Sequence, residues 1–121
     1  MKSIKALLAS LFLTGCSSQG YQTIPADQAK TMIEENQVVI IDVREEDEYN
    51  QGHIQNAILI PLSTIDKDNE LLPDKEETIL VYCRSGNRSA KASKKLVDLG
   101  YQNIYDFGGI INWPYDITKE E

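Results

Sequence analysis

One short segment of the chain brings a nucleophilic side chain close to two cations. Cys83 is followed directly by Arg84 and, after Ser85, Gly86 and Asn87, by Arg88. Fixed positive charge favours the thiolate, which is the reactive form of cysteine, and guanidinium groups bind small oxyanions. Gly86 allows the backbone to turn its amides inward as an anion-binding nest. We therefore predict that Cys83 is a nucleophile; a buried structural thiol, the alternative, explains neither arginine.

The residues on either side of this segment predict a strand followed by a helix. Thr78–Tyr82 is an apolar, β-branched run typical of a buried parallel strand. Small or apolar residues then recur at helical spacing, at Ser89, Ala92, Ser93, Leu96 and Val97, and Gly100 marks the helix end. The free N–H groups and the dipole at a helix N-terminus attract an anion, so these elements place Cys83 at an anion site.

Strand and helix patterns alternate along the rest of the chain. Strands are expected at Tyr21–Ile24, Val38–Val43, Ala57–Ile60 and Ile104–Phe107, helices at 25–36 and 45–49, and a tight turn at Gly108–Gly109. Alternation of this kind indicates an α/β domain. We expect a central parallel sheet of about four or five strands, flanked by helices on both faces, with Cys83 at a carboxyl end.

Four motifs, in the right order, resemble the rhodanese family of single-domain sulfurtransferases. The segment Cys83–Ser89, C-R-S-G-N-R-S, matches the family's active loop, C-R-x-G-x-R-[ST]. The other matches are the D-V-R motif at 42–44, the G-H-I and I-P segment at 52–61, and G-G-x-x-x-W at 108–113. The resemblance covers residues 21–115 and implies one rhodanese-like domain over 21–121.

The resemblance implies that a sulfane sulfur is transferred through a persulfide on Cys83. The partners would be a small donor anion such as thiosulfate and an acceptor, either cyanide or a thiol; no cofactor and no metal is implied. The substrate-binding set would be Arg84, Ser85, Gly86, Asn87, Arg88 and Ser89. Arg84 would bind the oxyanion of the donor, and Arg88 would anchor the loop and help to hold charge.

Three further polar residues are candidates for catalysis or for structural support. Asp42 and Arg44 end a predicted strand, where ligands bind in open α/β sheets, but the resemblance favours structural ion pairs. His53 is the single histidine and a candidate general base, yet in the family its position fixes a turn. We predict structural support for all three. The acidic run Glu45–Glu48 favours a solvated helix face over a metal site.

Two other functions share part of this pattern. Cysteine phosphatases also open an anion-binding loop with cysteine and close it with arginine, but with five residues between them. Here four residues, 84–87, separate Cys83 from Arg88, and Tyr82 stands where those phosphatases carry histidine. A persulfide carrier or binding module without turnover would need the same loop. The sulfurtransferase is therefore the prediction, the carrier is the alternative, and the phosphatase is the weaker candidate.

Length and charge limit the partners of the chain. With 121 residues, 41% hydrophobic and 26% charged, the chain suits one small globular domain, which we expect to be a monomer. A formal net charge of −7 argues against a nucleic-acid partner. The arginines beside Cys83 would form a local positive site on a negative body, which favours capture of a small anion by local donors.

The first residues resemble a bacterial lipoprotein signal peptide. Lys2 and Lys5 precede an apolar run at 6–13, and Leu13–Cys16 ends the pattern. Residues 1–15 would be removed, Cys16 would carry acyl chains such as palmitate, and 16–20 would be a tether to membrane lipid. We expect an exported domain anchored to the cell membrane or outer membrane, facing the periplasm or the exterior. An ordinary secretory peptide is the alternative.

Overall fold

The sheet at the centre of the molecule contains five parallel strands. The computed structural model describes residues 20–66 and 69–119, so Cys16 and the predicted leader lie outside the described residues. The strands are β1 (Gln22–Thr23), β2 (Val39–Asp42), β3 (Ile58–Leu59), β4 (Thr78–Cys83) and β5 (Asn103–Gly109). Their order is β1-β5-β4-β2-β3, and each neighbouring pair runs parallel. The predicted α/β fold with a parallel sheet is confirmed.

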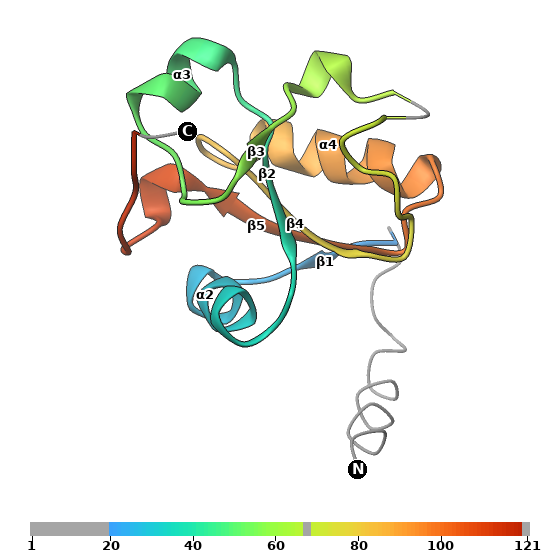
Figure 1. Ribbon diagram of the computed structural model, residues 1–121, viewed down its shortest axis with the longest axis horizontal. Coiled ribbons are helices and arrows are strands. Elements are labelled where there is room, and N and C mark those ends of the chain that lie inside the picture. Colours follow the sequence, from blue (N-terminus) through green and yellow to red (C-terminus); the bar gives the residue numbers. More distant parts are fainter. Residues whose placement is uncertain (1–19, 67–68, 120–121) are drawn as a thin grey trace.

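Helices cover both faces of this sheet, as predicted (Figure 1). Helix α2 (Ala26–Glu35) packs on one face and α4 (Asn87–Asp98) on the other. The connection from β2 to β3 contains α3 (Glu46–Gln51), the connection from β3 to β4 contains the 3-10 turn η1 (Leu62–Thr64), and the 3-10 turn η2 (Ile110–Asn112) follows β5. No helix within 20–66 or 69–119 is both long enough and apolar enough to cross a membrane.

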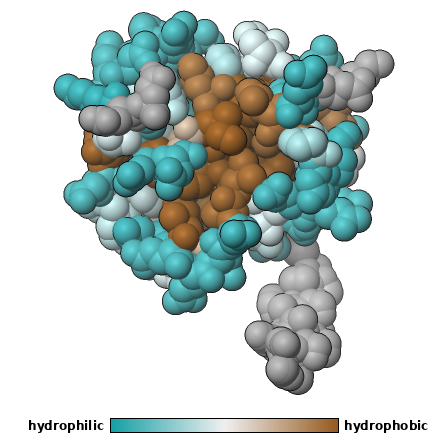
Figure 2. All heavy atoms as spheres, in the orientation of Figure 1, coloured by the Kyte–Doolittle hydropathy of each residue, from teal (hydrophilic) through white to brown (hydrophobic). Residues whose placement is uncertain are grey.

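Alternation along β4 sends neighbouring side chains into two separate cores. Val81 and Cys83 belong to the cluster that α4 completes with Ala92 and Leu96. Tyr82 points to the other face, into the cluster that includes residues of α2. Figure 2 shows apolar residues gathered at the centre of the face on which Figure 1 places β2 and β3, with hydrophilic residues around them. Cys83 therefore ends a strand that is buried on both sides.

Helix α4 begins at Asn87, two residues before the start of the predicted apolar pattern. Gly86, the N-cap, has a φ of 110°, a left-handed conformation that glycine adopts without steric cost. The backbone can therefore turn into the helix immediately after Ser85. As a result, Asn87 and Arg88 lie in the first turn of α4 rather than in the loop before it.

Strand β5 continues through the positions where the sequence predicted a tight turn. Gly109 pairs with Cys83 beyond a register shift between Val81 and Cys83, so Gly108 and Gly109 remain in the strand. The prediction of a turn at Gly108–Gly109 was wrong, because pairing with β4 continues past Phe107. This extension brings the end of β5 beside the loop that follows Cys83.

Candidate active site

The thiol of Cys83 lies beneath the first turn of α4. Its Sγ accepts hydrogen bonds from the backbone N–H groups of Gly86, at 3.0 Å, and Ser89, at 3.2 Å. These donors lie at a helix N-terminus, where N–H groups have no partner within the helix and the dipole favours negative charge. The residue is only 1% exposed, but its sulfur faces polar donors. This geometry stabilises an anionic sulfur.

Strand β5 fixes the path of the loop that follows Cys83. A Cβ atom added at Gly109 would overlap the carbonyl oxygen of Arg84 and lie 2.6 Å from the Cα atom of Ser85. The N–H of Ile111 donates to the same Arg84 carbonyl at 3.2 Å. Glycine at 109 is therefore required for the loop to pack directly on the backbone of β5.

Arg88 is held by a carboxylate on α3. Its two terminal nitrogens donate to the two carboxylate oxygens of Glu48, at 2.8 and 2.9 Å. These hydrogen bonds lower the pKa of Glu48 to about 2 and raise the pKa of Arg88. Glu48 also forms a capping box with Glu45 at the start of α3. The acidic run was predicted to be a solvated face; Glu48 departs from that prediction because Arg88 reaches it across 40 residues of sequence.

Arg84, in contrast, is exposed and has no hydrogen bond or ion pair from its side chain to any residue of the described chain. It lines an open pocket of about 270 Å³ together with Glu48, Ile111 and Ile117. The two isoleucines are more than half exposed, at 58% and 51%. The guanidinium of Arg84 is therefore available to an anion that enters beside the loop.

The other residues of the predicted substrate-binding set differ in exposure. Ser85 and Asn87 are exposed, Gly86 is half-buried, and Ser89 is buried. The hydroxyl of Ser89 donates to Oδ1 of Asp106 at 2.7 Å, so it points into the protein. Ser89 thus contributes its backbone N–H to the site and not its hydroxyl.

Sequence reasoning did not identify Asp106. A carboxylate within an otherwise apolar strand, between Tyr105 and Phe107, was the available signal. Its pairing with Ser89, 17 residues earlier, depends on how α4 crosses β5. A local sequence pattern contains no information on that contact.

Asp42 and Arg44 form a buried, bidentate ion pair at the end of β2. The arginine Nε and Nη2 atoms donate to the carboxylate at distances of 2.7 to 3.1 Å, and Nη2 also donates to the carbonyl of Gly52. Burial disfavours the charge on Arg44, yet the hydrogen bonds and charge of Asp42 outweigh that effect and raise the pKa of Arg44. The pair ties the strand end to the turn at Gly52.

The side chain of His53 is directed towards α3. Its Nδ1 donates to the carbonyl of Tyr49 at 2.9 Å, since a carbonyl oxygen can only accept. Its ring stacks on the ring of Tyr49 with centroids 3.6 Å apart, and its backbone pairs with Thr118. These contacts hold His53 at the turn after α3, and no hydrogen bond or ring contact joins its side chain to Cys83 in the described part of the chain.

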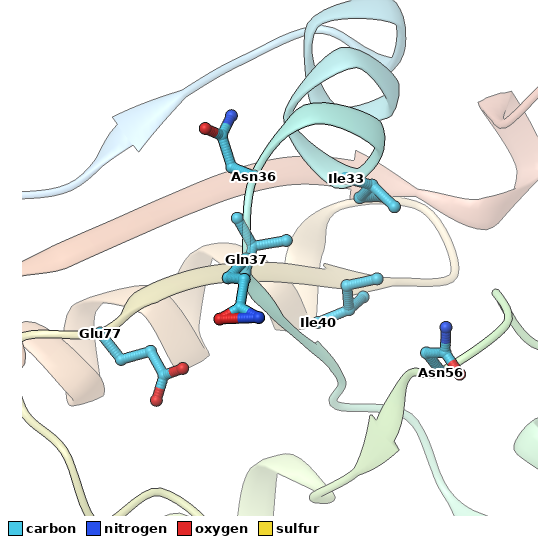
Figure 3. A pocket seen from close by; sticks show the side chains of 7 residues that line it. Ile33, Asn36, Gln37, Ile40, Asn56 and Glu77 are labelled. Carbon is cyan, nitrogen blue, oxygen red and sulfur yellow. The ribbon is translucent and has the colours of Figure 1, made fainter. Parts of the chain in front are cut away.

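The opposite end of the sheet contains a pocket of different character (Figure 3). It has a volume of about 390 Å³ and lies at the amino ends of the strands, where Ile33, Gln37, Asn56 and Glu77 contribute to its walls. None of the described residues that line this pocket is a cysteine, serine, lysine, arginine or histidine. Across residues 20–66 and 69–119, no group of three or more histidine, cysteine, aspartate or glutamate side chains is placed to hold a metal ion.

The family model of the Rhodanese-like domain matches residues 25–114. The chain belongs to the rhodanese-like domain family. The matched region contains all the strands from β2 to β5 and the whole Cys83 loop. The resemblance that the four sequence motifs indicated is therefore confirmed.

Solved structures of this family are similar over most of the domain. A rhodanese-related protein from Thermoplasma volcanium is 33% identical, with a TM-score of 0.72, and the match covers 83% of this chain and 100% of that one. A rhodanese with anions from E. coli is 34% identical, with a TM-score of 0.64 and coverage of 69% and 100%.

Relatives with established names include the tRNA uridine(34) hydroxylase of Yersinia pestis. It is 37% identical over 99 residues, which cover 74% of this chain but 27% of the hydroxylase. The chain thus spans about a quarter of the length of the curated relatives that it matches. The similarity is therefore confined to one part of each hydroxylase.

Proposed function

We propose that the protein is a sulfurtransferase that carries sulfane sulfur as a persulfide on Cys83. The two backbone N–H groups on Cys83 Sγ, at 3.0 and 3.2 Å, are the main support for this function. Sulfur transfer needs an anionic sulfur before the first step and again after the second. Fixed donors that stabilise this anion keep the nucleophile ionised for the first step and stabilise the departing Cys83 thiolate in the second.

In the first step, the Cys83 thiolate attacks the outer sulfur of thiosulfate or a similar donor. A new S–S bond forms, the S–S bond of the donor breaks, and its electron pair leaves on sulfite. The products are the Cys83 persulfide anion and a sulfite dianion, so charge and atoms balance. Arg84, the free guanidinium beside the loop, is placed to bind the oxyanion end of the donor.

In the second step, cyanide or a thiolate attacks the outer sulfur of the persulfide. The bond to Cys83 Sγ breaks, and its electron pair returns to Cys83 as thiolate. The product is thiocyanate or a new persulfide on the acceptor. No external oxidant or reductant is consumed, and the enzyme returns to its starting state with ping-pong kinetics.

The pairing of Arg88 argues against phosphatase chemistry. In a cysteine phosphatase, the arginine that closes the loop binds the phosphate oxygens. Here both terminal nitrogens of that arginine donate to Glu48, and the loop is one residue shorter. This arrangement favours a smaller reacting group, such as a single sulfur atom, at Cys83.

Intact-mass measurement with and without thiosulfate tests the proposal. We expect the protein to gain one sulfur atom on the Cys83 peptide and to release it as thiocyanate over many turnovers with cyanide. C83S should lose both reactions, while S93A, a small change at a buried residue of α4, should keep them. Turnover by C83S would contradict the proposal. Loading without discharge to cyanide or to small thiols would instead identify a persulfide carrier.

A membrane anchor at Cys16 is a separate proposal, supported by the pattern of residues 1–16. Acyl chains on Cys16 would place the domain on the outer side of a bacterial membrane. Expression of the full chain in a bacterium, followed by fractionation, tests it. We expect the wild-type chain in the membrane fraction, with an intact mass that shows a cleaved leader and added acyl chains, and C16A without acyl chains. A wild-type chain without acyl chains, or equal acylation of the two chains, would contradict the anchor.

A further inference from the structure

A buried carboxylate lies beneath the active loop and has no role in the reaction described above. Asp106 is 5% exposed and stands in β5 between Tyr105 and Phe107. Burial raises the pKa of Asp106, and hydrogen bonds from Ser89 and Gly108 offset part of that rise. None of the ion pairs formed within the described ranges includes it. A buried carboxylate destabilises a fold unless hydrogen bonds within the protein replace those that it loses with water.

Those hydrogen bonds converge on a single oxygen. Oδ1 of Asp106 accepts from the hydroxyl of Ser89 at 2.7 Å and from the backbone N–H of Gly108 at 2.9 Å. Ser89 lies in the first turn of α4, and Gly108 lies near the end of β5. One oxygen atom therefore joins the helix to the strand directly below the loop.

Ser89 and Gly108, the two donors to Asp106, are each connected to the site around Cys83 Sγ. The backbone N–H of Ser89 donates to Cys83 Sγ at 3.2 Å. On the other side, Gly108 precedes Gly109, the residue on which the backbone of Arg84 and Ser85 packs. The hydrogen bonds of Asp106 thus hold both the donor end of α4 and the support on which the loop lies.

We propose that Asp106 is a positioning residue for sulfur transfer, because its Oδ1 holds α4 and β5 at the spacing that keeps the Ser89 N–H on Cys83 Sγ. This inference rests on the proposed sulfurtransferase function. Asp106 does not touch the substrate in this scheme. It acts through Ser89 and Gly108, so its contribution should appear in the rate of the sulfur step and not in donor binding.

Two substitutions distinguish the loss of the hydrogen-bond acceptor from a change in side-chain size. Asp106→Leu keeps a side chain of similar size but removes the acceptor, while Asp106→Asn keeps an oxygen that can accept from both donors. We expect D106L to lower the rate of sulfur loading at saturating thiosulfate about tenfold, the effect of a modestly displaced oxyanion donor. We expect D106N to recover most of that rate. KM for thiosulfate should change little in either variant, because Arg84 is untouched.

Ser89 and Ser93 provide a matched pair of serines on one helix. Both are buried, but the Ser93 hydroxyl has no hydrogen-bond partner among residues 20–66 and 69–119, whereas the Ser89 hydroxyl donates to Asp106. S89A should therefore reproduce the loss seen in D106L, and the S89A/D106L double variant should lose no more than either single variant. S93A should load sulfur at the wild-type rate.

The measurements are single-turnover sulfur loading, the alkylation rate of Cys83 by iodoacetamide, and the midpoint of thermal unfolding. A wild-type rate in D106L, an equal loss in S93A, or a loss in D106N as large as in D106L would overturn the role of Asp106. So would a rate loss that follows the unfolding midpoint across the variants. If the wild-type protein takes up no sulfur, the proposed function fails. Slower Cys83 alkylation in D106L and S89A, but not in S93A, would then still support the positioning role.

Discussion

Two arginines of this domain form bidentate ion pairs with carboxylates in different surroundings. The Asp42–Arg44 pair lies at the end of β2, with side chains that are 0% and 6% exposed. The Glu48–Arg88 pair joins α3 to α4, with side chains that are 25% and 32% exposed. Water solvates a broken pair at the second position far better than at the first. The same type of contact therefore has a different consequence in each place.

Because of this difference, we assign structural support to the inner pair, Asp42–Arg44, and control of the loop to the outer pair, Glu48–Arg88. Arg44 also donates to the carbonyl of Gly52, so the inner pair fixes the chain after β2. The outer pair holds Arg88, the last cation of the active segment, and leaves Arg84 as the free guanidinium. We expect loss of the inner pair to reduce mainly folding stability, and loss of the outer pair to change the charge presented by the loop.

Breaking the inner pair should have the largest effect on stability. Arg44→Met keeps an unbranched chain but leaves the carboxylate of Asp42 buried without its partner. We expect the free energy of unfolding in urea to fall by about 3–5 kcal/mol, the usual cost of an uncompensated buried charge. The D42N/R44M double variant, which removes both charges, should recover a large part of that loss. A loss below 1 kcal/mol would show that water reaches Asp42 after all.

Acid should weaken the outer pair by protonating Glu48. The pKa of Glu48 is about 2 in the folded protein, held down by Arg88, against an ordinary value of 4.5. Because the folded value is the lower one, the contribution of Glu48 to stability is complete above pH 4.5 and disappears as the pH falls towards 2. Partial exposure limits this contribution to about 1 kcal/mol.

Glu48→Gln provides the measurement. The difference in unfolding free energy between the wild-type protein and E48Q should be about 1 kcal/mol at pH 7 and should shrink as the pH is lowered below 4.5. The double variant E48Q/R88M serves as the control, since it removes both charges. A difference that stays constant down to pH 2 would mean that Arg88 does not lower the pKa of Glu48 in the folded state.

The sequence was sufficient to predict the fold because the relevant signals are local. A continuous β-branched run at 38–43, for example, is typical of a strand buried on both faces, and β2 occupies its centre. Helical spacing from Ser89 predicted α4, although the helix starts at Asn87. The position of Cys83 between that strand pattern and that helix pattern was enough to predict an anion-binding thiol site.

The partners of the loop were not predictable in the same way. Glu48 reaches Arg88 across 40 residues, and Asp106 reaches Ser89 across 17. Each contact depends on how one element packs on another, which spacing along the chain does not encode. The close approach of Gly109 to the Arg84 backbone is likewise invisible as a motif, because the sequence there suggested only a turn. The residues of the loop are close together in the sequence, whereas the residues that hold the loop in place reach it only through the tertiary fold.

A third ion pair, whose side chains are more exposed than those of the other two pairs, completes the comparison. Lys94 and Asp98 pair one turn apart on α4, with side chains that are 64% and 62% exposed. Lys94→Ala should lower the free energy of unfolding by only about 0.3 kcal/mol, because water replaces the lost contact and salt screens the rest. Lys91→Ala is the matched control, since it removes the same charge from the same helix and Lys91 forms no ion pair with any residue of 20–66 or 69–119. If K94A lowered the free energy of unfolding more than K91A does, and by as much as R44M lowers it, burial could not explain the difference between the inner pair and the outer pair.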